Sequence, residues 1–323
     1  MKKIAVGLYG INGHQIHELL VDNKRAYCYG VAKIDKSLLP KEYDFSKIKF
    51  YDTYEEMLQD DNIDVVSLCS DRRKDQEQQA IDALNAGKHV YSEKPVAFSE
   101  EKLDEIIALA KEKNREFHDM ADTCFMEPFI SMREIINTGV LGEIVQVYAQ
   151  KSYPYHDRRP QDDETDGGLI RWIGIHATRF IEHTTGIKID KIYAVETGKG
   201  NPVKGGGLCM ASSLMMTLEN GAVGGMNLNY VNQRSFGVWG NEHLRVWGTK
   251  GFIETTDGCT KTRLVLEEKD MGPIELKHKD VNYFEYVLDK IIDNKDMPIS
   301  MEDEIHPLRA VLRAKDNVIE RIK

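Results

Sequence analysis

The chain has 323 residues, enough for two domains of ordinary size. Hydrophobic residues make up 41% of the chain and charged residues 30%, values typical of a globular protein with a packed core. The formal net charge of −10 argues against nucleic acid as a partner, because phosphate contacts need a basic face. No stretch approaches the roughly 18 consecutive apolar residues of a membrane helix, so no membrane partner is expected either.

Cysteine usage and the first residues of the chain predict a cytoplasmic protein. The five cysteines are Cys28, Cys69, Cys124, Cys209 and Cys259. None forms a CxxC pair, so we predict no metal site and no redox motif, only buried and reduced thiols. The apolar run that starts the chain is broken at Gly10 and lacks a small-residue cleavage site, which favours a strand over a signal peptide.

The first 120 residues alternate between strand and helix patterns. The predicted strands cover 4–9, 27–34, 63–69 and 89–92. The predicted helical segments cover 14–21 and 54–58, a helix that ends at Gly87, and a helix that begins at Ser99. Alternation of this kind implies right-handed βαβ units, so residues 1–120 are predicted to form a doubly wound parallel sheet.

The pattern changes after residue 120, and residues 121–323 are predicted to form a second α/β domain. The predicted helices cover 126–137, 169–184, 283–292 and 305–322. The predicted strands cover 143–152, 189–196, 209–218, 224–230 and 244–247. Turns at Asn220-Gly221 and Thr249–Gly251 favour antiparallel pairing in an open sheet. One face of that sheet has no obvious helix cover, which predicts a homodimer or homotetramer.

The first turn between strand and helix partly matches a dinucleotide-binding fingerprint. That fingerprint has glycines at positions 10, 12 and 15, and this chain keeps only Gly10. Asn12 and Gln15 replace the other two, and Gly13 is available to supply the lost backbone freedom. If a dinucleotide binds, its pyrophosphate is expected at the N-terminus of the following helix, where free N–H groups favour an anion.

The end of the second strand bears on the choice between NAD and NADP. An acidic residue about 20 positions after the glycine turn would bind the ribose 2′-hydroxyl of NAD. The expected position is Lys33, which suits the 2′-phosphate of NADP, whereas Asp35 would serve NAD in a register shifted by two residues. Both cofactors therefore stay open, with the pattern leaning toward NADP.

Four segments in order along the chain resemble the glucose–fructose oxidoreductase, inositol dehydrogenase and MocA (Gfo/Idh/MocA) family. They are Ala86-Gly87-Lys88-His89-Val90 followed by Glu93-Lys94-Pro95, then Gly139–Ile144, then Gly167-Gly168 through Gly174-Ile175-His176, and last Leu244–Gly251. The resemblance covers nearly the whole chain. It implies an NAD(P)-binding Rossmann domain followed by a substrate-binding α/β domain.

The resemblance also implies roles for two residues. Lys94 would hydrogen-bond the reacting oxygen of the substrate, and its ammonium group can stabilise charge there and relay a proton. His176 corresponds to the family's second catalytic position, a general acid or base. The bond between Lys94 and Pro95 is expected to be cis, as the family suggests, against a base rate of about 5–6% for bonds to proline.

Three departures from the family pattern bear on the chemistry. Trp172 stands four residues before His176, where dehydrogenases of polyols commonly have an aspartate, and it offers a flat apolar face for a sugar ring instead. Gln76 stands where the family often has a histidine. The segment Tyr153–Pro160 mixes Tyr, His and Arg, which suggests a polar and potentially anionic substrate, with Tyr155 or His156 as a substitute proton donor.

We therefore predict an NAD(P)-dependent oxidoreductase that transfers a hydride to or from a hydroxyl-bearing carbon of a sugar, cyclitol or similar small polar substrate. The predicted cofactor-binding residues are Gly10, Ile11, Asn12, Gly13, His14, Gln15, Ile16, Lys33, Ser70, Asp71, Gln76, Glu93 and Lys94. The predicted substrate-binding residues are Lys94, Tyr155, His156, Trp172 and His176, of which Lys94 and His176 are the predicted catalytic residues. Two alternatives stay open: elimination assisted by a retained NAD, and a non-catalytic NAD(P)- or sugar-binding regulator.

Overall fold

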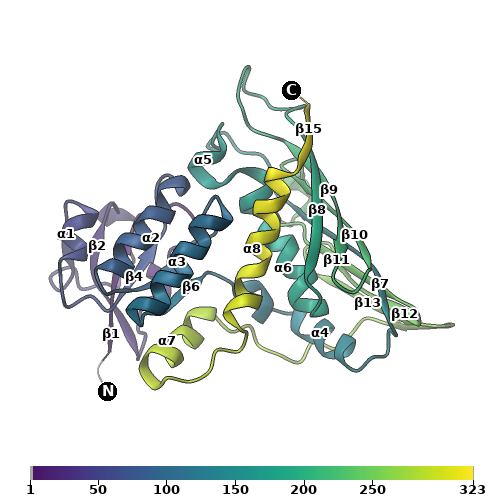
Figure 1. Cartoon of the computed structure of the whole chain (residues 1–323), viewed down its shortest axis with the longest axis horizontal. Helices are drawn as coiled ribbons and strands as arrows, with labels where there is room; N and C mark the ends of the chain where they lie inside the picture. The colour runs from purple at the N-terminus through teal and green to yellow at the C-terminus, as the bar shows by residue number, and fades with distance from the viewer. Residues whose placement is uncertain (1–2, 323) are drawn as a thin grey trace. The chain divides into compact units, whose positions relative to one another are not determined.

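The computed structural model describes residues 3–322, which form two compact units (Figure 1). The first unit contains the described residues up to Met120 together with two segments that return to it, Glu164–Asp166 and Tyr283–Met301. The second unit contains the remaining residues, from Ala121 onward. No helix within residues 3–322 combines the length and the apolar character needed to cross a membrane.

A six-stranded sheet forms the centre of the first unit. Its strands are β1 (Ile4–Tyr9), β2 (Ala26–Ala32), β3 (Lys49–Tyr51), β4 (Val65–Leu68), β5 (His89–Ser92) and β6 (Phe117–Asp119). The order is β3-β2-β1-β4-β5-β6 and every neighbouring pair is parallel, which confirms the predicted doubly wound sheet. The strand order reverses between β1 and β4. Ligands of such sheets bind at this switch point, outside the carboxyl ends of the strands.

Helices pack against this sheet. They are α1 (Tyr54–Leu58), α2 (Gln76–Asn85), α3 (Glu100–Lys113) and α7 (Tyr283–Asp293), with 3-10 turns η1 (Ile16–Leu20), η2 (Lys36–Leu38) and η3 (Arg73–Asp75). Figure 1 shows α2 and α3 side by side over the sheet. Ser99 caps α3 by accepting a hydrogen bond from the Lys102 amide, as its position in the sequence predicts. The late helix α7 joins this unit through a ring contact between Phe284 and Tyr91 in β5.

The predicted helix over residues 14–21 is wrong. Only the five-residue 3-10 turn η1 forms there, because the Gln15 side chain folds back and its Oε1 accepts from the Ile16 amide. The pyrophosphate site predicted at the N-terminus of the helix after the glycine turn stays a prediction, now at the start of η1.

A nine-stranded sheet forms the centre of the second unit. Its strands are β7 (Ile144–Ser152), β8 (Ile189–Thr197), β9 (Ala211–Leu218), β10 (Val223–Asn229), β11 (His243–Gly248), β12 (Gly251–Thr256), β13 (Lys261–Leu266), β14 (Lys269–Gly272) and β15 (Val318–Ile322). The order is β14-β13-β12-β11-β7-β10-β9-β8-β15. Only the pairs β7–β10 and β8–β15 are parallel, so the prediction of a mostly antiparallel sheet is confirmed.

Helices cover one face of the nine-stranded sheet (Figure 1). Besides α7, the helical elements from Ala121 onward are η4 (Asp122–Phe125), α4 (Phe129–Asn137), α5 (Asp163–Asp166), the π-helical turn η5 (Leu169–Ile173), α6 (Gly174–Thr185), η6 (Arg234–Phe236) and α8 (Met301–Asp316). The Thr178 hydroxyl of α6 donates to the Pro307 carbonyl of α8 at 3.0 Å, which ties these two helices together.

The predicted helix over residues 305–322 is wrong in its last third. Helix α8 ends at Asp316, and β15 then pairs in parallel with the edge strand β8. The β-branched residues Val318, Ile319 and Ile322 favour a strand, and the edge of β8 offers backbone groups that need partners.

The cysteines are free thiols where their side chains are described. Cys28, Cys69 and Cys209 are buried, whereas Cys259 is only half-buried because it lies in the turn between β12 and β13. The prediction of a buried thiol is therefore wrong for Cys259. Burial raises the pKa of the Cys28 thiol to about 12 and that of Cys259 to about 11. The side chain of Cys124 lies outside the described part of the structure.

Candidate active site

The turn after β1 keeps two glycines in conformations that other residues rarely adopt. Gly10 has a φ of +67°, and a Cβ there would lie 2.2 Å from the Cys69 carbonyl oxygen after β4. Gly13 has a φ of +118°, and a Cβ there would lie 2.8 Å from the Glu93 carboxyl carbon. Gly13 thus supplies the positive φ that the fingerprint otherwise takes from a glycine at position 12. The exposed face of the turn carries no bulky side chain at Gly13 and is open to a dinucleotide.

Gln15 occupies the third glycine position of the fingerprint but points away from that exposed face. Its Nε2 donates to the Gly10 carbonyl at 2.9 Å, and its Oε1 accepts from the Ser67 hydroxyl of β4 at 2.6 Å. The side chain is buried between the ends of β1 and β4 and therefore takes no space from a ligand. Ile16 is buried as well, so these two predicted cofactor residues shape the turn from below.

A buried arginine lies under the same turn. Arg73 in η3 donates from Nη2 to the Asn12 carbonyl at 2.5 Å and from Nη1 to Gln76 Oε1 at 2.9 Å. The Asn12 side chain in turn donates to the carbonyls of Asp71 and Thr165 at 3.1 and 3.0 Å. The positive charge of Arg73 beneath the turn favours an anion above it, which fits the pyrophosphate of a dinucleotide.

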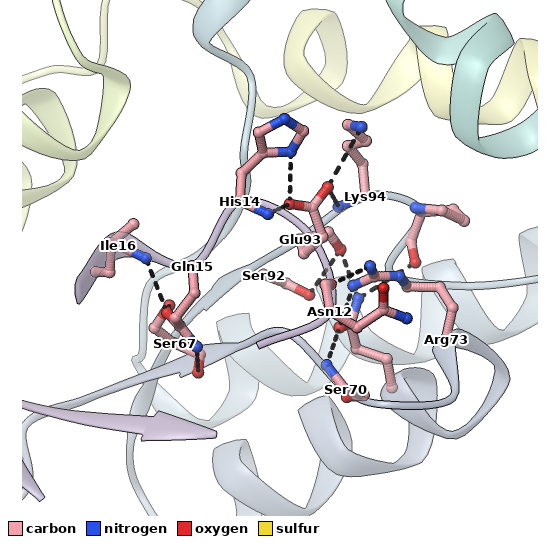
Figure 2. A network of polar contacts seen from close by, with 12 residues as sticks. Asn12, His14, Gln15, Ile16, Ser67, Ser70, Arg73, Ser92, Glu93 and Lys94 are labelled. Atoms are coloured by element: carbon pink, nitrogen blue, oxygen red, sulfur yellow. Dashed lines mark hydrogen bonds and ion pairs between the residues drawn. The ribbon is translucent and has the colours of Figure 1, made fainter. Parts of the chain in front are cut away.

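Figure 2 shows that His14 and Lys94 flank the carboxylate of Glu93. Glu93 Oε2 accepts from the His14 amide at 2.5 Å and contacts His14 Nδ1 at 2.9 Å. Glu93 Oε1 accepts from the Lys94 amide at 3.1 Å and lies 3.4 Å from Lys94 Nζ. Glu93 and Lys94 are buried, while the His14 side chain is 60% exposed. The peptide bond between Lys94 and Pro95 is cis, which confirms the expectation from the sequence.

Electrostatics and one glutamine hold Glu93 in its charged form and in place. Burial alone raises the pKa of the Glu93 carboxyl, but the attraction of His14, Lys94 and Arg73 and the hydrogen bond with His14 lower it well below its ordinary value. Gln76, the first residue of α2, donates to the Glu93 carbonyl at 2.5 Å and accepts from the Ser70 amide at 3.1 Å. Gln76 therefore links the loops that follow β4 and β5.

Lys33 and Asp35 follow β2 at the surface. Lys33 is exposed and has a φ of +58°, and within residues 3–322 it makes no hydrogen bond or ion pair with the network around Glu93. Asp35 caps η2, where its Oδ1 accepts from both the amide and the hydroxyl of Ser37. Those hydrogen bonds lower the pKa of Asp35. The remaining predicted residue of the turn, Ile11, is half-buried.

The second unit places Trp172 in the π-helical turn η5 directly before α6. His176 follows four residues later in the first turn of α6 and is half-buried. The Trp172 ring stacks on Tyr153 with centroids 6.2 Å apart and an interplanar angle of 21°. Trp172 is therefore part of an aromatic cluster and makes no proton transfer of its own. Single π-helical turns often occur at functional sites, which agrees with the placement of both residues.

The segment that follows Tyr153 lines a pocket of the second unit. Tyr155, Tyr230 and Arg234 are among the residues around this pocket of about 470 Å³, a volume suited to a small molecule. The His156 ring stacks against Trp239 with centroids 6.3 Å apart. Burial lowers the pKa of His156, and the nearby arginines lower it further.

In the first unit, the structure joins His14, Gln76 and Lys94 around Glu93, with Lys33 apart from them. In the second unit, ring contacts join Tyr153, Trp172, Trp239 and His156. No group of three or more potential metal ligands occurs within residues 3–322. Sequence reasoning missed Arg73 and Arg159, both of which are buried. Arg73 gave no signal beyond its place after β4, whereas Arg159 belongs to the segment that the sequence already connects with the substrate.

A parallel sheet with a glycine turn at its switch point and a buried lysine beside it defines a dinucleotide-binding oxidoreductase with a separate α/β domain. Residues 3–119 match the profile of the oxidoreductase family with an NAD-binding Rossmann fold. Residues 129–254 match the GFO/IDH/MocA C-terminal domain. The chain belongs to the Gfo/Idh/MocA oxidoreductase family, and its first unit is the NAD-binding Rossmann domain of that family.

Three curated relatives illustrate the range of this family. The uncharacterized oxidoreductase YrbE of Bacillus subtilis is 24% identical over 98% of this chain and 95% of its own. The trans-1,2-dihydrobenzene-1,2-diol dehydrogenase of Bos taurus is 27% identical over 75% of this chain and 70% of its own. The myo-inositol 2-dehydrogenase of Thermotoga maritima is 24% identical over 69% of this chain and 66% of its own.

Solved structures share the fold across the whole chain. KijD10, a 3-ketoreductase from Actinomadura kijaniata in complex with NADP, superposes with a TM-score of 0.80 at 14% identity and covers 100% of both chains. GenD2 from gentamicin A biosynthesis, in complex with NAD, superposes with a TM-score of 0.79 at 17% identity, covering 98% of this chain and 94% of its own.

Proposed function

We propose that the protein catalyses reversible hydride transfer between NAD(P) and a hydroxyl-bearing carbon of a sugar, cyclitol or related small polar molecule. The single observation that carries this proposal is the buried pair of Glu93 and Lys94, with 3.4 Å between carboxylate and ammonium, directly under the glycine turn. A buried lysine paired in this way is a group with a chemical task more often than a structural one. The dehydrogenases of diols and inositol among the relatives agree in reaction type.

In this mechanism the chain's own residues handle the oxygen and its proton. When bound, NAD(P) supplies the acceptor or donor of the hydride. Lys94 Nζ donates a hydrogen bond to the reacting oxygen and stabilises the negative charge that this oxygen carries once its proton has left and before the hydride leaves the carbon. Glu93 favours the ammonium form of Lys94 and orients it. We assign the proton released from the hydroxyl to His176, by the family resemblance.

The first experiment is a titration of the protein with NADH and with NADPH, followed by nicotinamide fluorescence. Micromolar affinity for one form is expected, and a screen of polyols and sugars with that cofactor then measures NAD(P)H formation. If neither nucleotide binds and denatured protein releases none, the proposal is wrong.

A non-catalytic regulator is the second candidate, and Trp172 is the observation that favours it. A tryptophan stacked on Tyr153 cannot share a proton with His176 as an aspartate would. The two functions differ in one readout. A regulator binds NAD(P) and a sugar without consuming either, whereas the proposed enzyme changes NAD(P)H absorbance when both are present.

We further propose that a second copy of the chain covers the open face of the nine-stranded sheet. Met215 in β9 is 69% exposed, and Tyr193, Val195 and Val223 are exposed beside it on β8 and β10. Apolar side chains gathered on a sheet face are typical of an interface. The variant Met215→Glu is expected to shift the protein from dimer or tetramer toward monomer in size-exclusion chromatography with light scattering. An unchanged mass for the variant, or a monomeric wild type, would contradict this interface.

A further inference from the structure

Arg159 is a buried cation for which the described part of the chain provides no anionic partner. Its side chain is 5% exposed, and its Nε has no hydrogen-bond acceptor. Within residues 3–322, no carboxylate forms an ion pair with it. Arginine is almost never fully buried unless it is paired, because the charged form loses its hydration. Arg159 therefore differs from Lys151, another buried cation of the second unit, which pairs with Glu242.

Three aromatic rings surround the guanidinium group of Arg159. Its central carbon lies 4.2 Å from the centroid of Tyr230, 4.7 Å from Trp172 and 5.7 Å from Tyr153. Rings at these distances attract the flat faces of a guanidinium. Its N–H groups lie in the plane of the guanidinium, and the buried Nε–H has no acceptor among residues 3–322. These edges are the part of arginine that binds carboxylates and phosphates with two parallel hydrogen bonds.

The surroundings of Arg159 are positively charged. Burial lowers the pKa of the neighbouring His156, and the charges of Arg159, Arg158 and Arg234 lower it further, while Asp157 acts in the opposite direction. Arg234 also lines the pocket of about 470 Å³, together with Tyr230, whose ring contacts Arg159. A small molecule in this pocket thus meets the cation of Arg234 directly, and Arg159 contacts the Tyr230 ring of the pocket wall.

We propose that Arg159 binds an anionic group of the substrate, a carboxylate or a phosphate, so that the substrate is a sugar acid or a sugar phosphate. The inference rests on the proposed function and names its substrate class. Trp172 connects Arg159 with the proposed reaction site, because it contacts Arg159 and precedes the proposed acid–base residue His176 by four positions. A purely structural role would not require a charge, since an apolar side chain of the same size would fill the cage without the cost of burying an ion.

The test compares three probes that differ at one carbon: glucose, glucuronate and glucose 6-phosphate. Each is titrated by calorimetry into the full-length protein saturated with NAD(P). Wild type is expected to bind at least one of the two anions roughly 10- to 100-fold more tightly than glucose, the usual range for a hydrogen bond to a charged group. Preference for glucuronate identifies a carboxylate as the ligand group, and preference for glucose 6-phosphate identifies a phosphate.

Variants then assign the preference to Arg159. Arg159→Gln is expected to abolish the preference for the anion while leaving glucose and NAD(P) binding unchanged. Arg159→Lys keeps the charge, occupies the same cage and is expected to retain part of the preference. Arg158→Gln is the matched control, because it removes the same charge from the exposed neighbouring residue and should leave the preference intact.

Several results would overturn the proposal. They are equal binding of all three probes to wild type, binding of none of them to a protein that holds NAD(P), and a preference that persists in Arg159→Gln. Calorimetry needs no turnover, so these outcomes are separate from failure of the proposed function. If the protein prefers an anion but no substrate changes the NAD(P)H absorbance, Arg159 is still a binding residue. Only the proposed dehydrogenase reaction is then wrong.

Discussion

Polar side chains around Glu93 in the first unit are joined to one another by hydrogen bonds, whereas the side chains around Arg159 in the second unit are held by stacked rings. His14, Lys94 and Gln76 each contact Glu93 through a nitrogen at 2.5 to 3.4 Å. Around Arg159, the contacts are to ring centroids at 4.2 to 5.7 Å. In the first arrangement both carboxylate oxygens of Glu93 have hydrogen-bond partners, whereas in the second the Nε of Arg159 has no acceptor among residues 3–322.

This difference suits the two units to different ligands, the first to the cofactor and the second to the substrate. NAD and NADP share the nicotinamide, the pyrophosphate and most of both riboses, so a hydrogen-bonded network with fixed geometry suits either cofactor. A substrate varies between members, and rings with a cation among them can accept different shapes at little cost in backbone change. Substitutions in the first cluster should therefore affect chemistry and cofactor binding, and substitutions in the second should affect substrate binding alone.

The largest expected effect comes from Lys94→Ala. Loss of the ammonium group removes charge stabilisation at the reacting oxygen, so kcat should fall roughly 100- to 10,000-fold. The fold should persist, because the carboxylate of Glu93 keeps its contacts with His14. Turnover is measured by NAD(P)H absorbance and the fold by thermal unfolding.

Lys111→Ala, an exposed substitution on α3, is the control for this variant. Normal turnover in Lys94→Ala would contradict the proposed mechanism. It would also mean that the residues around Glu93 do not take part in catalysis.

The charge on Glu93 should make stability depend on pH. The folded state holds the pKa of this carboxyl well below its ordinary value of about 4.3, although burial opposes this. Its stabilising contribution is therefore complete above about pH 4.3 and is lost as the pH falls toward the folded pKa. In that window, Glu93→Gln should reduce the slope of unfolding free energy against pH by about 1.4 kcal/mol per unit.

Urea unfolding at a series of pH values measures this slope. Glu112→Gln removes one carboxylate from the exposed end of α3 and should leave the slope unchanged. An identical slope in wild type and Glu93→Gln would mean that Glu93 is not held in its charged form.

Trp172→Ala tests the second region. Removal of the ring takes a stacking surface from the substrate and one wall from the cage of Arg159, so KM for the substrate should rise about tenfold. Dissociation constants for NADH and NADPH should not change. Trp172→Phe should recover most of the loss, since a phenyl ring keeps the flat surface.

Trp247→Ala in β11 is the matched control for loss of a half-buried tryptophan. If Trp172→Ala changes the affinity for the cofactor but leaves KM for the substrate unchanged, the proposal that the second cluster binds only substrate is wrong.

The sequence predicted the parallel sheet, the mostly antiparallel sheet and the cis bond at Lys94, because hydrophobic periodicity and a dense family motif are local signals. It did not predict η1 in place of a helix. That outcome depends on Gln15, whose side chain finds acceptors and donors on β1 and β4, and Ser67 is 52 positions away in the chain. Nor did it predict β15, which forms because β8 is an edge strand.

The burial of Arg73 and Arg159 lay beyond sequence reasoning for a similar reason. An arginine after a strand is usually solvated, and only the folded chain shows that Arg73 lies against the Asn12 carbonyl. Likewise, the rings around Arg159 come from three separate segments, at Tyr153, Trp172 and Tyr230. The sequence indicated a polar substrate from the residues themselves but could not indicate which cation would be buried.

The smallest expected effect concerns Lys33 and the choice of cofactor. Asp35 uses its carboxylate to cap η2 through Ser37, which leaves the exposed ammonium of Lys33 as the charged group available after β2. We therefore expect tighter binding of NADPH than NADH, and Lys33→Ala should weaken NADPH about fivefold, the scale of an exposed ion pair, without changing NADH. Fluorescence titration measures both, with Lys41→Ala as the exposed control. Tighter binding of NADH than of NADPH by wild type would mean that the region after β2 recognises the ribose 2′-hydroxyl of NAD. Asp35→Asn would then be the variant to test, in place of Lys33→Ala.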